Sequence, residues 1–101
     1  MARVVRTPLG RADLKQIGRY VARESGSRAV ALGLLDLIRE KMELYATQPE
    51  LGEKRPDLGE AVRQFAVKSC VVFYRPIEDG IEVLRVLHGS RDIPSVWRRG
   101  E

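Results

Sequence analysis

The sequence has few of the residues that disulfide, metal or membrane proteins require. Cys70 is the only cysteine and His88 the only histidine, which excludes an internal disulfide and a four-cysteine zinc site. No apolar run approaches the roughly 18 residues of a membrane span, and the N-terminus lacks a secretory apolar region. No glycine-rich nucleotide loop is present. We therefore expect a cytoplasmic protein that uses no metal or other cofactor and does not contact a membrane.

The length and composition predict one globular domain spanning residues 1–101, because 44% of the residues are apolar and 32% are charged. A chain this short buries only about 60–65% of the surface that its unfolded form exposes. The isolated domain is expected to be only modestly stable, so a bound partner could contribute to its stability. The net charge is +4, and the basic excess lies mainly in residues 1–24. Arginine outnumbers lysine by 14 to 4, which suits phosphate or carboxylate recognition but also follows from a GC-rich genome.

Local signals predict the element order β-α-α-β-β-β. Residues 2–6 are expected to form a strand, and Thr7 followed by Pro8 is typical of a helix start. The glycine and serines at 25–27 should end that helix, with Ser27 capping a second helix over 28–47. Residues 50–60 are expected to be loop. Strands over 61–67, 70–75 and 81–87 should form an antiparallel meander, followed by a tail without a predicted element.

We therefore predict an α+β domain of two layers. The first strand pairs beside the meander, and the N-terminal helical hairpin packs on one face of a mainly antiparallel sheet. The apolar positions of the second helix span more than half of its circumference, although a helix on one sheet needs only a stripe of about 100°. The extra width must be buried by the first helix, by a partner or by both. The additional positions are Val30, Leu37 and Leu44.

The first predicted helix carries a row of basic residues four apart. Like charges at this spacing repel each other slightly. The row is either a solvated face or a strip that faces a partner. Its members are Arg11, Lys15, Arg19 and Arg23.

Four short stretches, in this order and spacing, support a family resemblance. They are Pro-Glu-Leu-Gly at 49–52, Leu-Gly-Glu-Ala-Val-Arg at 58–63, Val-Phe-Tyr-Arg at 72–75 and Val-Leu-Arg-Val-Leu-His-Gly-Ser-Arg-Asp at 83–92. With the preceding strand and helical hairpin, the chain resembles the RelE/ParE superfamily of toxins from type II toxin–antitoxin systems over about residues 3–94. The last stretch is similar to the ParE form.

The resemblance implies a small cognate antitoxin. Such an antitoxin packs a helix against the helical hairpin and sometimes adds a strand to the sheet. The apolar rows of the second helix suit a partner helix, because helix-in-groove recognition uses residues four and seven apart. The alternative is that the first helix covers these positions. The residues that we predict for antitoxin binding are Val30, Leu34, Leu37 and Leu44.

The superfamily uses two toxic mechanisms. RelE-like members cut mRNA on the ribosome, whereas ParE-like members poison DNA gyrase. RNA cleavage needs a base for the 2′-OH, cations for the phosphorane charge and an acid for the leaving oxygen. His88 is the only side chain that ordinarily titrates near neutral pH. If the protein is a ribonuclease, the candidate catalytic residues are Arg63, Arg85, His88 and Arg91.

Each of these candidates also has a structural alternative. His88 could pack at the end of a strand, and Arg85 could form a salt bridge with Asp92. Cleaving members usually carry a C-terminal aromatic or second acid–base group and several lysines, whereas this tail lacks Tyr, His and Lys. We therefore expect no catalytic residues and a toxin that binds gyrase, with an mRNA endonuclease as the alternative. Candidate target-binding residues are Arg63, Arg91, Trp97, Arg98 and Arg99.

Overall fold

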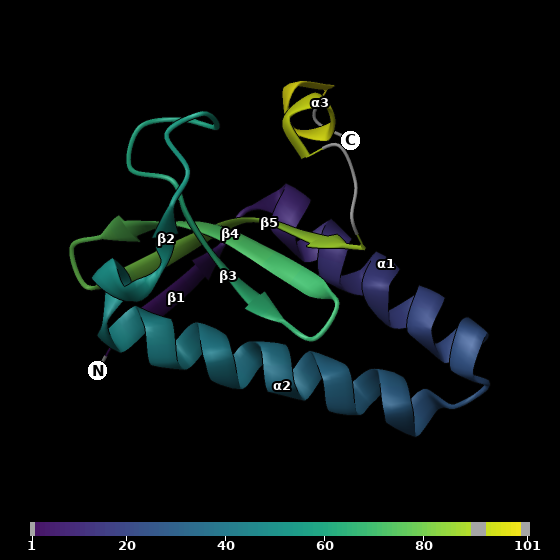
Figure 1. The fold of residues 1–101 in the computed structure, drawn as a ribbon. Coiled ribbons are helices and arrows are strands. Elements are labelled where there is room, and N and C mark those ends of the chain that lie inside the picture. The colour runs from purple at the N-terminus through teal and green to yellow at the C-terminus, as the bar shows by residue number, and fades with distance from the viewer. Residues whose placement is uncertain (1, 90–92, 100–101) are drawn as a thin grey trace.

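The protein folds as a helical hairpin on a five-stranded sheet, with a short helix on the opposite face (Figure 1). The computed structural model describes residues 2–89 and 93–99, the side chain of Arg99 excepted. None of the helices in these ranges is long and apolar enough to cross a membrane. The elements are β1 Arg3–Arg6, α1 Pro8–Ser25, α2 Arg28–Thr47, η1 Pro49–Leu51, β2 Glu53–Lys54, β3 Arg63–Val67, β4 Cys70–Ile77, β5 Gly80–His88 and α3 Ile93–Arg99.

The sheet confirms the predicted class. Its strand order is β1-β5-β4-β3-β2, and β3, β4 and β5 form the antiparallel meander. The first strand runs parallel to β5 at its edge. The N-termini of α1 and α2 are capped by the residues that the sequence predicted. The Thr7 hydroxyl accepts from the N–H of Gly10 at 3.0 Å, and the Ser27 hydroxyl accepts from the N–H of Val30 at 3.2 Å. Between the helices, Gly26 takes a left-handed conformation with φ of 68°.

Besides β4 and β5, whose bounds extend the predicted strands by one or two residues, three details differ from the sequence prediction. The predicted loop at 50–60 contains the 3-10 turn η1 and the two-residue strand β2. The strand predicted over 61–67 begins at Arg63 rather than at residue 61, because Ala61 has a φ of 66° and belongs to the preceding turn. The tail contains α3, a helix that its proline and its short length concealed.

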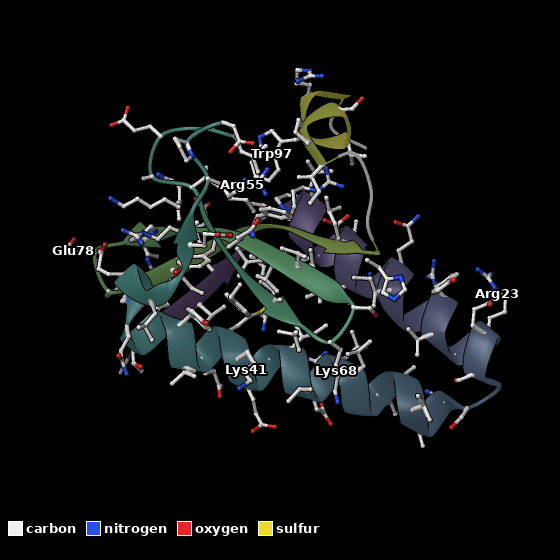
Figure 2. The ribbon with its side chains drawn as sticks, in the orientation of Figure 1. Arg23, Lys41, Arg55, Lys68, Glu78 and Trp97 are labelled. Carbon is white, nitrogen blue, oxygen red and sulfur yellow. The ribbon has the colours of Figure 1, made fainter. Side chains whose placement is uncertain are left out.

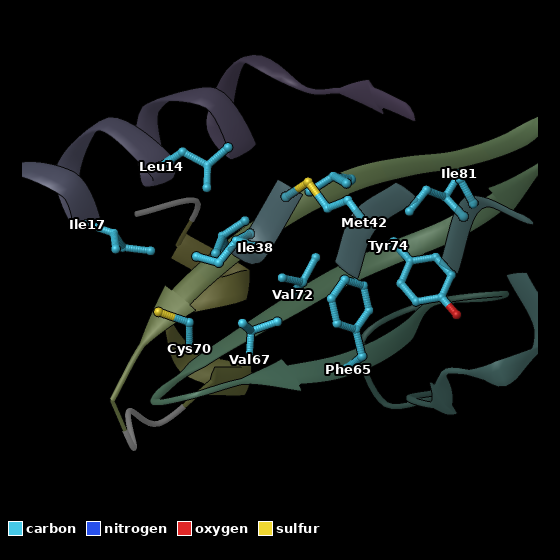
Figure 3. Close-up of a cluster of buried hydrophobic side chains, with 13 residues drawn as sticks. Leu14, Ile17, Ile38, Met42, Phe65, Val67, Cys70, Val72, Tyr74 and Ile81 are labelled. Atoms are coloured by element: carbon cyan, nitrogen blue, oxygen red, sulfur yellow. The ribbon is translucent and has the colours of Figure 1, made fainter. Parts of the chain in front are cut away.

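The main core lies between the helical hairpin and the sheet. Figure 3 shows Leu14 and Ile17 of α1 and Ile38 and Met42 of α2 gathered with side chains from the strands. On the other face, Phe73 of β4 packs with side chains of β5 and α3. Both faces of β4 are therefore covered, which fits its nearly continuous run of apolar residues. The strand residues of the main core are Phe65, Val67, Cys70, Val72, Tyr74, Ile81, Val83 and Val86.

A β-bulge lets β5 contribute to this core. Val83 and Val86 both face the helices, although residues three apart in a regular strand point to opposite faces. The register shifts because Tyr74 lies opposite Val83 while Phe73 lies opposite Arg85, which leaves Leu84 as the extra residue. The bulge thus turns the side chains on both sides of Leu84 toward the main core, where β5 packs against α1.

Asp13 of α1 and Arg85 of β5 form a buried ion pair. Asp13 Oδ2 lies 2.8 Å from Nε of Arg85, and Asp13 Oδ1 lies 3.0 Å from Nη2. Asp13 Oδ2 also accepts from the N–H of Val86 at 2.9 Å. Arg85 therefore forms a salt bridge, as the structural alternative proposed, but with a different residue. Its partner among the described residues is Asp13, and Asp92 lies outside them.

We expect Asp13→Ala to lower the free energy of unfolding by about 3–5 kcal/mol, because it leaves a buried guanidinium and the N–H of Val86 without their acceptor. Urea denaturation followed by circular dichroism measures the change. Asp36→Ala is the control, since it breaks the exposed Asp36–Arg39 pair and should cost no more than about 0.5 kcal/mol. Equal losses in the two variants would contradict a structural role for the buried pair.

Candidate functional site

The guanidinium of Arg63 is held by hydrogen bonds within the protein. On β3, its Nη1 donates to the main-chain oxygens of Glu50 at 2.9 Å and Gly52 at 2.8 Å. Its Nη2 lies 2.7 Å from the carboxylate of Glu50. These three contacts use the guanidinium to fix the turn at residues 49–52. Binding a phosphate with this side chain would require some of them to break.

Tyr74 fixes the same turn from β4. Its hydroxyl donates to the main-chain oxygen of Pro49 at 2.6 Å and accepts from the N–H of Gly52 at 3.0 Å. A Cβ atom at residue 52 would collide with the Tyr74 hydroxyl, so glycine is required there. Burial raises the pKa of the Tyr74 phenol. Arg63 and Tyr74 therefore both form hydrogen bonds with the Pro-Glu-Leu-Gly stretch at 49–52.

His88 lies at the end of β5 and packs against α1. Its ring centroid is 5.1 Å from that of Tyr20, and its Nε2 lies 3.0 Å from the Ser69 hydroxyl oxygen. Across β4, His88 is opposite Cys70 whereas Arg63 is opposite Tyr74. The two candidates are therefore separated by four residues along the sheet, roughly 13 Å, and by two strand spacings, roughly 10 Å.

The structure does not bring the ribonuclease candidates together. Arg85 is buried against Asp13, Arg63 holds the 49–52 turn, and His88 lies beside Tyr20 at a different place in the sheet. Arg91 lies outside the described residues. Among residues 2–89 and 93–98, no group of three His, Cys, Asp or Glu side chains is arranged to hold a metal ion.

The apolar stripe of α2, formed by Val30, Leu34, Leu37 and Leu44, is exposed at two of its four positions. Val30 is 53% exposed and Leu44 is 45% exposed, while Leu34 and Leu37 are half-buried beside the main core. The first helix approaches α2 elsewhere, where Gly18 faces Leu35. At 100° per residue, Leu35 lies on the opposite flank from the stripe. The alternative that α1 covers the stripe is therefore wrong for Val30 and Leu44.

A free strand edge lies near this stripe. β2 pairs with β3 only at Arg63 and Gln64, so residues 65–67 have no described strand on their outer side. Tyr45 of α2 stacks on Phe65 of β3, with ring centroids 4.1 Å apart and planes at 3°. Through this contact, the side of α2 that carries the stripe lies next to the unpaired edge of β3. A partner could therefore meet an apolar helix face and unpaired main-chain groups together.

The candidate target-binding residues of the tail lie in α3. Trp97 meets Phe73 edge-on at 5.5 Å between centroids, and Arg98 is exposed. Arg99 ends α3, but its side chain and Arg91 lie outside the described part of the chain. Trp97 thus contributes to the second core (Figure 2).

Sequence reasoning missed two surface features. Arg55 lies 5.8 Å from the centroid of the Phe73 ring, and its bond to Asp57 raises the pKa of its guanidinium. No local pattern marks it, because it lies in an irregular segment. Leu51 is 57% exposed, more than any other large apolar side chain described. A signal existed for Leu51, which follows Leu44 by the seven-residue interval that relates Val30, Leu37 and Leu44.

Comparisons with known proteins identify the class. The family described as "ParE toxin of type II toxin-antitoxin system, parDE" matches residues 4–93. Toxin ParE3 of Caulobacter vibrioides is 33% identical over 93 residues, which cover 92% of each chain. A solved structure titled "Chromosomal ParDE TA system from P. aeruginosa" has the same fold, with a TM-score of 0.74 and 22% identity over 89% of this chain and 98% of that one.

The chain is therefore a toxin-type component of a type II toxin–antitoxin system. Within that class it belongs to the ParE toxin family. The resemblance drawn from the stretches at 49–52, 58–63, 72–75 and 83–92 is confirmed.

We expect Tyr74→Phe to lower the free energy of unfolding at neutral pH by about 1–3 kcal/mol, because Pro49 and Gly52 lose a buried hydrogen-bond partner. The raised pKa of Tyr74 adds a pH dependence. The folded protein holds the phenolic proton more tightly than the unfolded chain, so this contribution is complete below about pH 10 and is lost as the pH rises further. The variant should therefore lose less stability than the wild type above about pH 10.

Urea denaturation at neutral and alkaline pH tests this expectation. Tyr20→Phe is the matched control, because no hydrogen bond of the Tyr20 hydroxyl to a described residue is found and its ring packs against His88, away from Tyr74. Cys70, whose thiol pKa burial also raises, is present in all three proteins and cancels in the comparison. Identical alkaline profiles for the wild type and Tyr74→Phe would contradict the role given to the phenol.

Proposed function

We propose that this ParE-family toxin acts in the bacterial cytoplasm by inhibiting DNA gyrase and thus replication, and that a cognate antitoxin neutralises it. One observation carries the choice of gyrase over mRNA. The side chains that a ribonuclease would need, Arg63, Arg85 and His88, have internal partners and lie apart. Acid–base cleavage requires such groups to converge on one phosphate. A binding toxin needs exposed surface instead.

The antitoxin would bind the apolar stripe of α2. Burying Val30 and Leu44 would remove about half of each side chain from water, and Leu34 and Leu37 extend the surface toward the core. A partner helix would present apolar residues at matching intervals, and an adjoining extended segment could pair with the outer edge of β3. A small domain gains stability from such a partner, because binding only the folded state shifts the folding equilibrium.

We expect Val30→Asp and Leu44→Asp each to weaken antitoxin binding at least about tenfold, because a charge would be buried against an apolar partner. Both positions are exposed, so folding should be unaffected. Leu32→Asp is the matched control: Leu32 is 49% exposed on the same helix but lies away from the stripe. Isothermal titration calorimetry measures the affinities. Equal weakening by Leu32→Asp would place the antitoxin elsewhere.

The target is tested with gyrase from the protein's own host. The purified chain is expected to inhibit supercoiling or to stabilise DNA breaks in proportion to its concentration, and added antitoxin should relieve the effect. His88→Ala should keep this activity, because the ring packs against Tyr20 and Ser69. An unaffected gyrase, together with mRNA cleavage on ribosomes that His88→Ala abolishes, would instead establish the endonuclease alternative.

A further inference from the structure

The outer face of α1 carries four cations in a line. Arg11, Lys15, Arg19 and Arg23 are all exposed and follow each other at intervals of four residues. The buried face of the same helix is formed by Gly10, Asp13, Leu14 and Ile17, so the row points away from the sheet. Arg23 is labelled near the hairpin end of the helix in Figure 2.

No described acidic side chain neutralises this row. The six ion pairs among the described residues include none of its four members. Asp13, on the other face of α1, is already bound to Arg85. Glu24 directly follows Arg23, and neighbours in a helix do not face each other. Four like charges at this spacing repel, and glutamate at alternate positions would have relieved the repulsion. Arg23 lies in the last turn of α1, where a cation favours the helix dipole, but no described ion pair accounts for the row as a whole.

The row is long enough to run past several phosphates of a DNA strand. From Arg11 to Arg23 the helix rises roughly 18 Å, with roughly 6 Å between neighbouring cations. One DNA strand presents a negative charge about every 3.4 Å along the duplex axis. Three of the four residues are arginines, whose planar guanidinium suits phosphate oxygens. Contacts between such cations and phosphate oxygens position a protein on DNA without reading its sequence, and an evenly spaced row of charges offers this kind of contact.

We propose that the α1 row Arg11, Lys15, Arg19 and Arg23 binds the phosphate backbone of duplex DNA without sequence preference. The contact follows from the row alone. Its role in toxicity rests on the proposed function, because gyrase holds a DNA duplex and a toxin bound to gyrase could touch that duplex through α1. The exposed stripe of α2 lies on a different helix and remains the antitoxin surface.

The test measures the salt dependence of DNA binding. Fluorescence anisotropy gives the Kd of the full chain for a labelled duplex of roughly 20 base pairs between about 50 and 200 mM NaCl. Four phosphate contacts predict a slope of log K against log salt of about −3.6. The variant with Arg11, Lys15, Arg19 and Arg23 all changed to Gln should bring this slope close to zero and lose at least about tenfold in affinity at the lowest salt.

The control variant has the same net charge. It changes four other exposed cations, Arg28, Arg39, Lys41 and Lys68, to Gln and should keep most of the wild-type slope. Thermal unfolding shows whether both variants fold, and Gln is nearly as good a helix former as Lys or Arg. If one variant fails to fold, single changes of Lys15 and Arg19 to Gln, each expected to reduce the slope by about 0.9, take its place.

Three results would overturn the proposal: no binding of DNA by the wild type at low salt, equal losses in the two variants, or binding of polyglutamate with no binding of DNA. The third would assign α1 to an acidic protein surface. Gyrase supercoiling measured on the same proteins separates this inference from the proposed function. If DNA binding depends on the row but the chain leaves gyrase unaffected, the DNA contact is supported and its role in gyrase inhibition is not.

Discussion

The carboxylate of Asp13 joins parts of the chain that are more than 70 residues apart. It accepts from the guanidinium of Arg85 and from the N–H of Val86, and so provides β5 with an acceptor beyond the end of β1. Thr7, between β1 and α1, is the first residue to bond to β5 in place of a strand residue. Its N–H donates to the main-chain oxygen of Val83, and its hydroxyl donates to the main-chain oxygen of Leu84. Beyond Arg6, α1 therefore takes over from a neighbouring strand. A strand edge left bare would be open to pairing with other chains.

This arrangement fixes the direction of both helices and the surfaces they present. With Asp13 turned to β5, the row from Arg11 to Arg23 must face solvent, because it lies on the opposite side of the helix. The contact of Gly18 with Leu35 then sets α2 so that Ile38 and Met42 enter the core and the stripe of Val30 and Leu44 remains outside. One buried pair thus separates a basic surface on α1 from an apolar surface on α2. Two partners of different chemistry could therefore bind the hairpin on different faces.

Local signals predicted the elements better than they predicted the contacts between them. Thr7 and Ser27 cap their helices because capping depends on a few adjacent residues, and the bounds of α2 agree at both ends. The pairing of Arg85 with Asp13 depends on tertiary structure, whereas the sequence suggested only the nearby Asp92 as a partner. The facing of Val83 and Val86 depends on a bulge that no turn residue marks. Exposure of Val30 and Leu44 was left open for the same reason, since it depends on where α1 crosses.

The residues that reveal the family are mainly those that hold the fold together. Arg63 and Tyr74 grip the turn at 49–52, and Arg85 is buried with Asp13. A match to such residues identifies the architecture and the family, because changing them would leave buried polar groups without partners. It says less about the target, which meets only the surface. A target or antitoxin can contact only exposed side chains, and in this chain these include the row on α1, Val30 and Leu44 of the stripe on α2, and Arg98 on α3.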